Sequence, residues 1–293
     1  MAGFEIPGYE ILEKIGEGGM AVVYKARQLS LGRMVAIKIL RPNLAEDPVS
    51  VAQFKLEANS VATLKHPNIV QIHEAGEFSG TYFFVMEYVA GYSVGRWLNR
   101  KGLLTEENAL LVANPVAKAL EYAWSKSGLI HCYIKPDNVM VDEDGTIKLS
   151  DFSGLSFSRK SPEAETLAGV VIGTPNYMAP EQARGVAGLD FRADIYALGA
   201  VLYHLISGIL PFKDTPEMEA AKRHISDFLE DPRKMNPDVS EGMALLIQKM
   251  MVKNHEDRYA NWGLVIADIA RVKEGKLPLG PWPDLYASTV VLK

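Results

Sequence analysis

The hydrophobic and polar residues follow two different periods along the chain. Residues 9–28 alternate between the two kinds and are interrupted by glycines, which predicts two strands joined by a flexible turn. Residues 34–40 form a third apolar run, typical of a strand. From Val49 the apolar residues recur every three or four positions, the spacing of a helix with one buried face. Residues 69–77 and 82–89 then return to short, strand-like runs.

The rest of the chain has a mainly helical pattern. A helix over residues 105–126 should begin after Thr105, a good N-cap that is followed by two acidic residues favoured by the helix dipole. Pro115 should bend this helix or loosen one of its turns. Residues 190–208 are apolar on almost every side, which is typical of a helix buried inside a lobe. Further helices are expected over residues 93–100, 243–252 and 262–272.

The composition acts mainly by excluding classes of protein. The 293 residues are 48% hydrophobic and 23% charged, with a formal net charge of -5 and no Lys/Arg cluster, which argues against nucleic-acid binding. The single cysteine, Cys132, allows no intrachain disulfide and no cysteine-based zinc site, and it favours a reducing, cytoplasmic location. We find neither a signal peptide nor an apolar run long enough to span a membrane.

Glycines cluster in the first predicted turn, in the string IGEGGMAVV over residues 15–23. Backbone N–H groups can approach phosphate oxygens closely where no Cβ intervenes, so Gly16 and Gly18 are candidates for phosphate binding. On its own this motif is weak, because a glycine-rich hairpin that binds nothing has the same appearance. Lys38 in the next strand and Glu57 in the following helix are, taken singly, equally compatible with ordinary surface residues.

Motifs that follow in order make the pattern specific. They are LIHCYIKPDNVMV (129–141), DFSG (151–154) and GTPNYMAPEQARG (173–185). With the glycine-rich string and Lys38 they resemble the protein kinase family, in particular the bacterial eukaryotic-like (Hanks-type) Ser/Thr kinases.

The resemblance covers residues 9–273. It implies an α+β, bilobal kinase fold with a β-rich N-lobe that carries helix αC (about 9–90) and a mainly helical C-lobe (about 91–273). A nucleotide would bind in the cleft between them, and residues 274–293 would form a C-terminal tail or a linker.

The resemblance also assigns roles to single residues. Lys38 would hold the α- and β-phosphates of ATP and pair with Glu57, while Asn138 and Asp151 would bind Mg²⁺. Asp194 would brace the backbone of the loop at 129–141. A salt bridge is predicted between Arg258 and Glu181. The implied nucleotide-binding set is Ile15, Gly16, Gly18, Val23, Ala36, Lys38, Glu57, Met86 as gatekeeper, Glu87 and Val89 in the hinge, and Met140.

The segment after Asp151 resembles a kinase activation loop. Residues 155–172 are polar, show no periodicity and contain Ser156, Ser158, Ser161 and Thr166.

The chain departs from the kinase pattern at two minor and two major positions. Ala21 replaces the third glycine of the phosphate loop, and Ser153 replaces the glycine of D-F-G. Cys132 stands in place of the family's arginine, and Tyr133 stands in place of the aspartate that receives the substrate proton. A phenol titrates near pH 10, so Tyr133 would donate a hydrogen bond rather than accept a proton. General-base assistance is usually worth about 10²–10⁴ in rate, so phosphotransfer should be very slow or absent.

Neighbouring groups offer only weak substitutes for the lost base. Asp137 is a minor candidate, because in an extended loop it should point away from the phosphate. Asp142 and Asp144 are better interpreted as turn formers. Cys132 is interpreted as a small buried side chain, with a thiol activated by Lys135 as the alternative.

Three hypotheses about function remain open. The favoured one is a pseudokinase that binds ATP, with Mg²⁺ as a possible companion, and acts as a scaffold or allosteric partner of another protein, such as an active kinase or its substrate. The second is a weakly active or atypical Ser/Thr kinase. The third is an interaction module that binds no nucleotide.

Overall fold

The computed structural model describes residues 5–154, 156–157, 175–212 and 217–280. The chain divides into two compact units, residues 1–91 with 142–144 and residues 92–141 with 145–293. Most of the predicted activation loop, with Ser158, Ser161 and Thr166, lies outside the described residues. The last part of the predicted tail, residues 281–293, does so as well.

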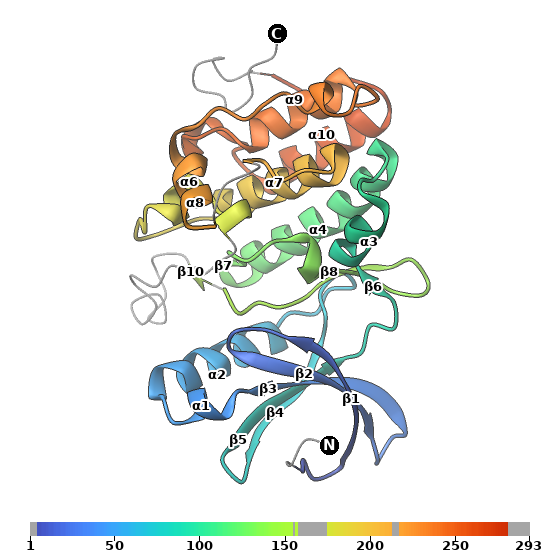
Figure 1. Cartoon of the computed structure of the whole chain (residues 1–293), viewed down its shortest axis with the longest axis vertical. Helices are drawn as coiled ribbons and strands as arrows, with labels where there is room; N and C mark the ends of the chain where they lie inside the picture. The colour runs from blue at the N-terminus through green and yellow to red at the C-terminus, as the bar shows by residue number, and fades with distance from the viewer. Residues whose placement is uncertain (1–4, 155, 158–174, 213–216, 281–293) are drawn as a thin grey trace. The chain divides into compact units, whose positions relative to one another are not determined.

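The first unit contains a five-stranded antiparallel sheet in the order β1-β2-β3-β5-β4 and confirms the predicted strand-rich beginning (Figure 1). Helix α2 begins at Pro48, one residue before the predicted start, because the Asp47 carboxylate caps it by accepting from the N–H of Ser50 at 3.0 Å. The element bounds are β1 Tyr9–Glu17, β2 Ala21–Gln28, β3 Arg33–Leu40, α1 Pro42–Ala45, α2 Pro48–Ala62, β4 Ile72–Phe78 and β5 Thr81–Glu87.

Aromatic packing fixes α2 on this sheet. The rings of Phe54 on α2 and Phe84 on β5 lie 5.0 Å apart, centre to centre. Phe84 is also the cross-strand partner of Lys38 on β3. Glu57 follows Phe54 by three residues and therefore lies on the same face of the helix. This packing brings the Glu57 carboxylate to Lys38.

The second unit is mainly helical, as predicted, and its small sheets have the orders β6-β8-β9 and β10-β7. Its elements are β6 Tyr92–Ser93, α3 Val94–Lys101, α4 Glu106–Ser127, β7 Leu129–Ile130, η1 Pro136–Asn138, β8 Val139–Val141, β9 Ile147–Leu149, β10 Ser156–Phe157, η2 Pro175–Tyr177, α6 Pro180–Ala183, α7 Arg192–Ser207, α8 Glu217–Ser226, η3 Pro232–Lys234, α9 Glu241–Met250, η4 His255–Asp257 and α10 Trp262–Lys273.

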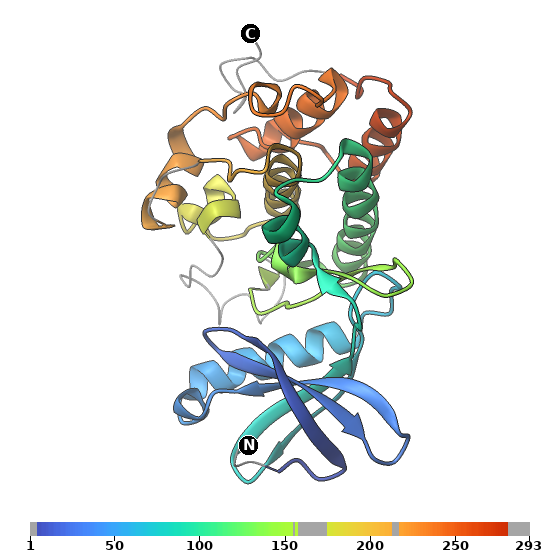
Figure 2. The same cartoon turned by 45° about the vertical axis from the view of Figure 1, so that its right-hand side comes forward.

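Helix α7 forms the centre of the second unit. It lies between α4 and α9 (Figures 1 and 2), and almost all of its side chains are buried, as its apolar pattern predicted. Thr105 caps α4 as expected, accepting from the N–H of Asn108 at 3.3 Å. The helix continues through Pro115 to Ser127. Among the described residues, no helix combines the length and apolar character needed to cross a bilayer.

Hydrogen bonds fasten residues 276–280 to helices of the same unit. The buried Asp268 carboxylate accepts from the N–H of Leu279 at 2.8 Å, and Lys249 donates to the Leu279 carbonyl at 2.8 Å. Arg271 donates to the Leu277 carbonyl at 2.9 Å. The described start of the predicted tail is therefore packed against α9 and α10.

Candidate functional site

Lys38 and Glu57 form the predicted ion pair. The Lys38 ammonium lies 2.7 Å and 3.0 Å from the two carboxylate oxygens of Glu57, and both residues are buried. A buried charge is tolerated when it is paired, so the opposite charges of Lys38 and Glu57 compensate each other in the interior. The prediction of this contact is confirmed, and its role toward a nucleotide stays a prediction.

The glycine-rich turn joins β1 and β2. The register pairs Gly16 with Val23, and Gly18 donates from its N–H to the Ala21 carbonyl at 2.9 Å. A Cβ added at Gly19 would meet nothing within 4 Å, and one at Gly18 would meet only the Ala21 carbonyl oxygen, at 3.8 Å. Neither glycine is among the described glycines with positive φ. The hairpin itself therefore does not need glycine at these two positions, whereas a ligand approaching the backbone closely would.

Ala21 occupies the third glycine position and is buried as the first residue of β2. Its backbone pairs with Leu40 of β3. Its Cβ is therefore covered by the protein, which makes this replacement a mild one for the turn.

The predicted hinge follows β5. Met86 pairs with Ala36 across the β3–β5 ladder, so these two predicted nucleotide contacts lie side by side. The N–H of Glu87 is used by the Gln71 carbonyl at 2.8 Å. In the described part of the chain, no hydrogen bond joins the backbone of Val89 to another residue. Val89 thus retains a backbone donor and an acceptor of the kind that an adenine ring requires. Ile15 is an exposed residue of β1, and its predicted contact with a nucleotide stays a prediction.

Asp194 braces the loop at 129–141, as predicted. Its two carboxylate oxygens accept from the N–H groups of His131 at 2.8 Å and Cys132 at 2.9 Å. Burial raises the pKa of Asp194 to about 7, while these two donors act in the opposite direction. Cys132 adopts a positive φ of 59°. The bonds from Asp194 therefore hold the backbone in a conformation that a non-glycine residue rarely adopts.

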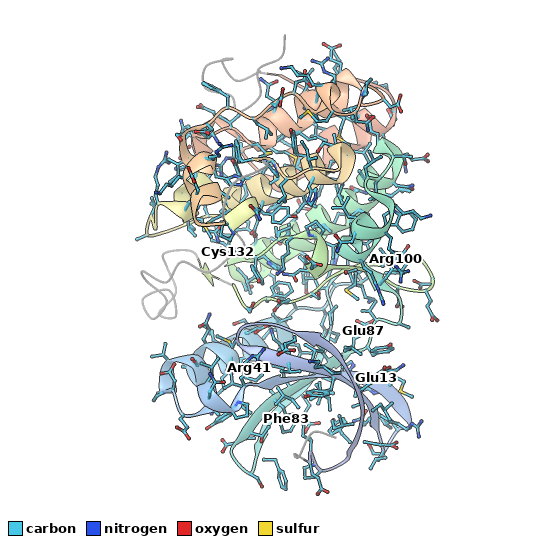
Figure 3. All side chains as sticks on the ribbon, viewed as in Figure 1. Glu13, Arg41, Phe83, Glu87, Arg100 and Cys132 are labelled. Carbon is cyan, nitrogen blue, oxygen red and sulfur yellow. The ribbon has the colours of Figure 1, made fainter. Side chains whose placement is uncertain are left out.

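The Cys132 side chain is buried in the second unit (Figure 3). Burial raises the pKa of its thiol well above the usual value, and the carboxylates of Asp194 and Glu181 raise it further. The alternative of a thiol activated by Lys135 is therefore wrong, because desolvation disfavours the thiolate. The interpretation as a small buried side chain is confirmed. Its carbonyl accepts from the buried amide of Gln182 at 2.8 Å.

Tyr133 and Lys135 contact each other directly. The Lys135 ammonium donates to the Tyr133 hydroxyl at 2.8 Å and lies 4.2 Å from the centre of the same ring. Both side chains are half-buried. By the kinase resemblance Lys135 would neutralise phosphate charge; here its ammonium is engaged by the tyrosine that stands at the base position. A Cβ added at Gly154 would lie 2.8 Å from the Tyr133 Cβ, so Gly154 is required for this packing.

The proposed metal ligands flank a short hairpin. Strands β8 and β9 pair Val139 with Leu149, which places Asn138 and Asp151 near the same end of the ladder. The Asn138 amide donates to the Tyr133 carbonyl at 2.8 Å, which orients its oxygen as a remaining acceptor. An amide oxygen and a carboxylate match the preference of Mg²⁺ for oxygen ligands. Among the described residues no group of three or more His, Cys, Asp or Glu could hold a metal ion. Two ligands completed by phosphate oxygens are the usual arrangement for Mg²⁺.

Of the acidic residues next to the loop at 129–141, Asp137 differs from the prediction and Asp142 agrees with it. Asp137 lies in the 3-10 helix η1 and not in an extended loop, and its carboxylate packs against Gly95 of α3. Asp142 forms the β8–β9 turn as predicted, accepting from the N–H of Glu143 at 2.9 Å. Met140 lies half-buried in β8.

Phe152 of the D-F-S-G segment is buried and packs against His131. The centres of the two rings lie 4.4 Å apart. The His131 ring also contacts the Ser150 carbonyl at 3.2 Å. Asp151, between these residues, has a positive φ of 57°. The segment is therefore held in place from both sides of Asp151.

The predicted Arg258–Glu181 salt bridge is confirmed. Its two bonds measure 2.6 Å and 2.8 Å, with the Arg258 side chain fully buried. Burial raises the pKa of Glu181, but the hydrogen bond and charge of Arg258 outweigh it and lower the pKa overall.

Sequence reasoning missed two residues of this region. Gln182 holds the Cys132 carbonyl, and Arg41, labelled in Figure 3, contacts the glycine-rich turn. Gln182 follows the A-P-E motif directly, but nothing in the pattern indicated its partner. Arg41 directly follows the strand of Lys38, and its charge was the only signal.

Comparison with known proteins agrees with this geometry. A model described as the protein kinase domain matches residues 9–268. The chain is 38% identical over 268 residues to a probable serine/threonine-protein kinase of Clostridium perfringens, covering 91% of this chain and 38% of the relative. It is 39% identical over 290 residues to serine/threonine-protein kinase pkn3 of Myxococcus xanthus, covering 96% and 53%.

A third relative, serine/threonine-protein kinase PknB of Mycobacterium tuberculosis, is 35% identical over 277 residues, covering 93% of this chain and 44% of the relative. The chain thus spans between 38% and 53% of the length of these three relatives. With the family model matching most of its residues and the ion pairs of Lys38 and Arg258 in place, the chain belongs to the protein kinase domain family.

Proposed function

We propose that this chain is a pseudokinase that binds ATP, accompanied by Mg²⁺, and acts as a scaffold or allosteric partner of another protein. The observation that carries this proposal is the Tyr133–Lys135 contact at 2.8 Å. The tyrosine stands at the position of the base, and its hydroxyl also engages the ammonium that would neutralise phosphate charge. The partner would be an active kinase or a kinase substrate. We place the kinase-like domain at residues 9–273, divided near residue 90, with a tail at 274–293.

Nucleotide binding is supported by groups that the fold alone does not require. Gly19 borders open space, and the Val89 backbone lacks a partner among the described residues. Glu57 holds the Lys38 ammonium at 2.7 Å, which supports a role of Lys38 toward the phosphates. When bound, Mg²⁺ would neutralise phosphate charge, and Asn138 and Asp151 would hold it.

Thermal unfolding with and without ATP and Mg²⁺ tests the nucleotide half of the proposal. ATP at ten times its Kd stabilises the folded state by about 1.4 kcal/mol, which is a shift of a few degrees for a chain of this size. Lys38→Met serves as the control, because it removes the charge while keeping an apolar stem. If millimolar ATP leaves the wild-type transition unmoved, ATP binding is excluded.

A radiolabel assay tests the other half. With γ-labelled ATP and a general protein substrate, we expect the wild type to incorporate no more label than Lys38→Met. Incorporation that disappears in Lys38→Met would favour the second candidate, an atypical Ser/Thr kinase. The intact Lys38–Glu57 pair and the Asp194 brace are the observations in favour of that candidate.

A further inference from the structure

Arg41 contacts the glycine-rich turn at three points. Its backbone N–H donates to the Met20 carbonyl at 3.0 Å, and its Nε donates to the Gly18 carbonyl at 2.9 Å. Its terminal nitrogen pairs with the Glu17 carboxylate at 2.5 Å. All of these residues lie in the first unit. Arg41 directly follows β3, so it links the strand of Lys38 to the turn.

The hydrogen bond from Arg41 to the Gly18 carbonyl fixes the orientation of the peptide group between Gly18 and Gly19. A carbonyl and the N–H of the next residue point to opposite sides of the planar peptide, so holding the Gly18 carbonyl turns the Gly19 N–H away from Arg41. The N–H of Gly18 is already used by the Ala21 carbonyl at 2.9 Å. The Gly19 N–H thus remains as a donor for an anion on the open side of the turn.

Glycine makes this peptide easy to rotate, which gives Arg41 its importance. Without a Cβ, both Gly18 and Gly19 have access to many backbone conformations, so an unheld peptide would face in either direction. A guanidinium can hold the Gly18 carbonyl and the Glu17 carboxylate simultaneously through its planar fork. A lysine ammonium has no such fork.

We propose that Arg41 is a positioning residue for nucleotide phosphates. It fixes the Gly18–Gly19 peptide so that the Gly19 N–H faces the phosphate, and Glu17 in turn fixes the guanidinium. Arg41 acts through the backbone and does not touch the nucleotide. This inference rests on the proposed binding of ATP and adds the residue that prepares the turn for it.

Affinities for ATP and adenosine, measured by calorimetry, separate positioning from general stability. Arg41→Met should weaken ATP binding by about tenfold, which is the effect of about 1.4 kcal/mol. It should leave the affinity for adenosine unchanged, because adenosine has no phosphate. The Arg41 side chain is 32% exposed, so the variant is expected to fold.

Two further variants serve as controls. Arg33→Met removes the same charge from the first residue of β3, where the Arg33 Nε donates to the Gln28 side chain at 2.7 Å, and it should bind ATP as the wild type does. Arg41→Lys keeps the charge but not the fork, and it should weaken ATP binding at least threefold. Amide hydrogen exchange at Gly18, whose N–H donates to the Ala21 carbonyl, should be faster in Arg41→Met, with the global unfolding midpoint unchanged.

The measured affinities distinguish failure of the role of Arg41 from failure of the proposed function. Equal losses for ATP and adenosine in Arg41→Met, or an ATP affinity equal to that of the wild type, would overturn the role of Arg41. Full ATP affinity in Arg41→Lys would show that charge alone acts and would overturn positioning through the fork. If the wild type binds neither ligand, the proposed function itself fails, and the inference fails with it.

Discussion

The Lys135 ammonium donates a hydrogen bond of 2.8 Å to the Tyr133 hydroxyl. The contact joins residues only two positions apart, and the same ammonium lies over the tyrosine ring. Replacing a carboxylate by a phenol therefore changes two groups together. By the kinase resemblance the loop lacks its proton acceptor, and its lysine gains both the hydroxyl and the ring of Tyr133 as partners.

Tyr133→Asp should restore phosphotransfer. The change returns a carboxylate to the loop and removes the hydroxyl that engages Lys135, so the rate should rise by about 10² or more over the wild type. Incorporation of label into a general protein substrate measures it. Tyr133→Phe is the matched control: it removes the hydroxyl that Lys135 binds, keeps the ring, supplies no base and should stay inactive. Equal activity in both variants would show that the engaged lysine, and not the missing base, limits the wild type.

Gly19→Ala should separate folding from nucleotide binding. A Cβ at Gly19 meets nothing within 4 Å, so the free energy of unfolding should stay within about 0.5 kcal/mol of the wild type or rise slightly. The same Cβ would hinder a phosphate approaching the turn, so ATP should bind more weakly. Denaturant unfolding and ATP titration measure the two effects. An unchanged ATP affinity would argue against phosphate contact at this turn.

Glu181→Gln should destabilise the second unit strongly. The Arg258 guanidinium is fully buried, and removing its partner charge leaves it uncompensated, at a cost of about 3–5 kcal/mol. Urea unfolding measures the loss. Glu230→Gln makes the same chemical change in the exposed pair with Lys234 and should cost less than about 1 kcal/mol. Similar losses in the two variants would contradict the importance of burial.

Stability should fall on acidification because of His224. Burial, assisted by the Lys253 charge, lowers the pKa of His224 to about 3, whereas an unfolded histidine titrates near 6.5. Tyr196 and the Asn176 carbonyl bind its two ring nitrogens at 2.9 Å each, which suits the neutral ring. The unfolded state therefore binds more protons between pH 3 and 6.5. The stability contributed by His224 is complete above about pH 6.5 and is lost as pH falls.

The slope of unfolding free energy against pH checks this prediction. Near pH 5, His224 should contribute about 1.4 kcal/mol per pH unit. His224→Gln should remove that share whatever its effect on absolute stability. Burial also lowers the pKa of His204, to about 4. His204 should therefore add to the slope of the unfolding free energy against pH, and His204→Gln should remove that addition. An unchanged slope in His224→Gln would refute the assignment.

Much of the fold was predictable because its signals are periodic and local. The cap at Thr105 and the apolar character of α7 are properties of neighbouring residues. The two buried ion pairs were also expected, since the order of the kinase motifs specifies which distant residues meet. Asp137 was misplaced in an extended loop because a 3-10 turn of three residues leaves no period to detect.

The amino-acid sequence by itself determined the family, the order of the elements and the presence of Tyr133 where the kinase pattern has an aspartate. Only the tertiary structure decided what the replacements do. Burial raises the pKa of the Cys132 thiol, and loop geometry brings Lys135 to the Tyr133 hydroxyl. The path of the chain after β3 brings Arg41 to Gly18. Desolvation and side-chain direction depend on atoms from many parts of the chain, and no local pattern records them.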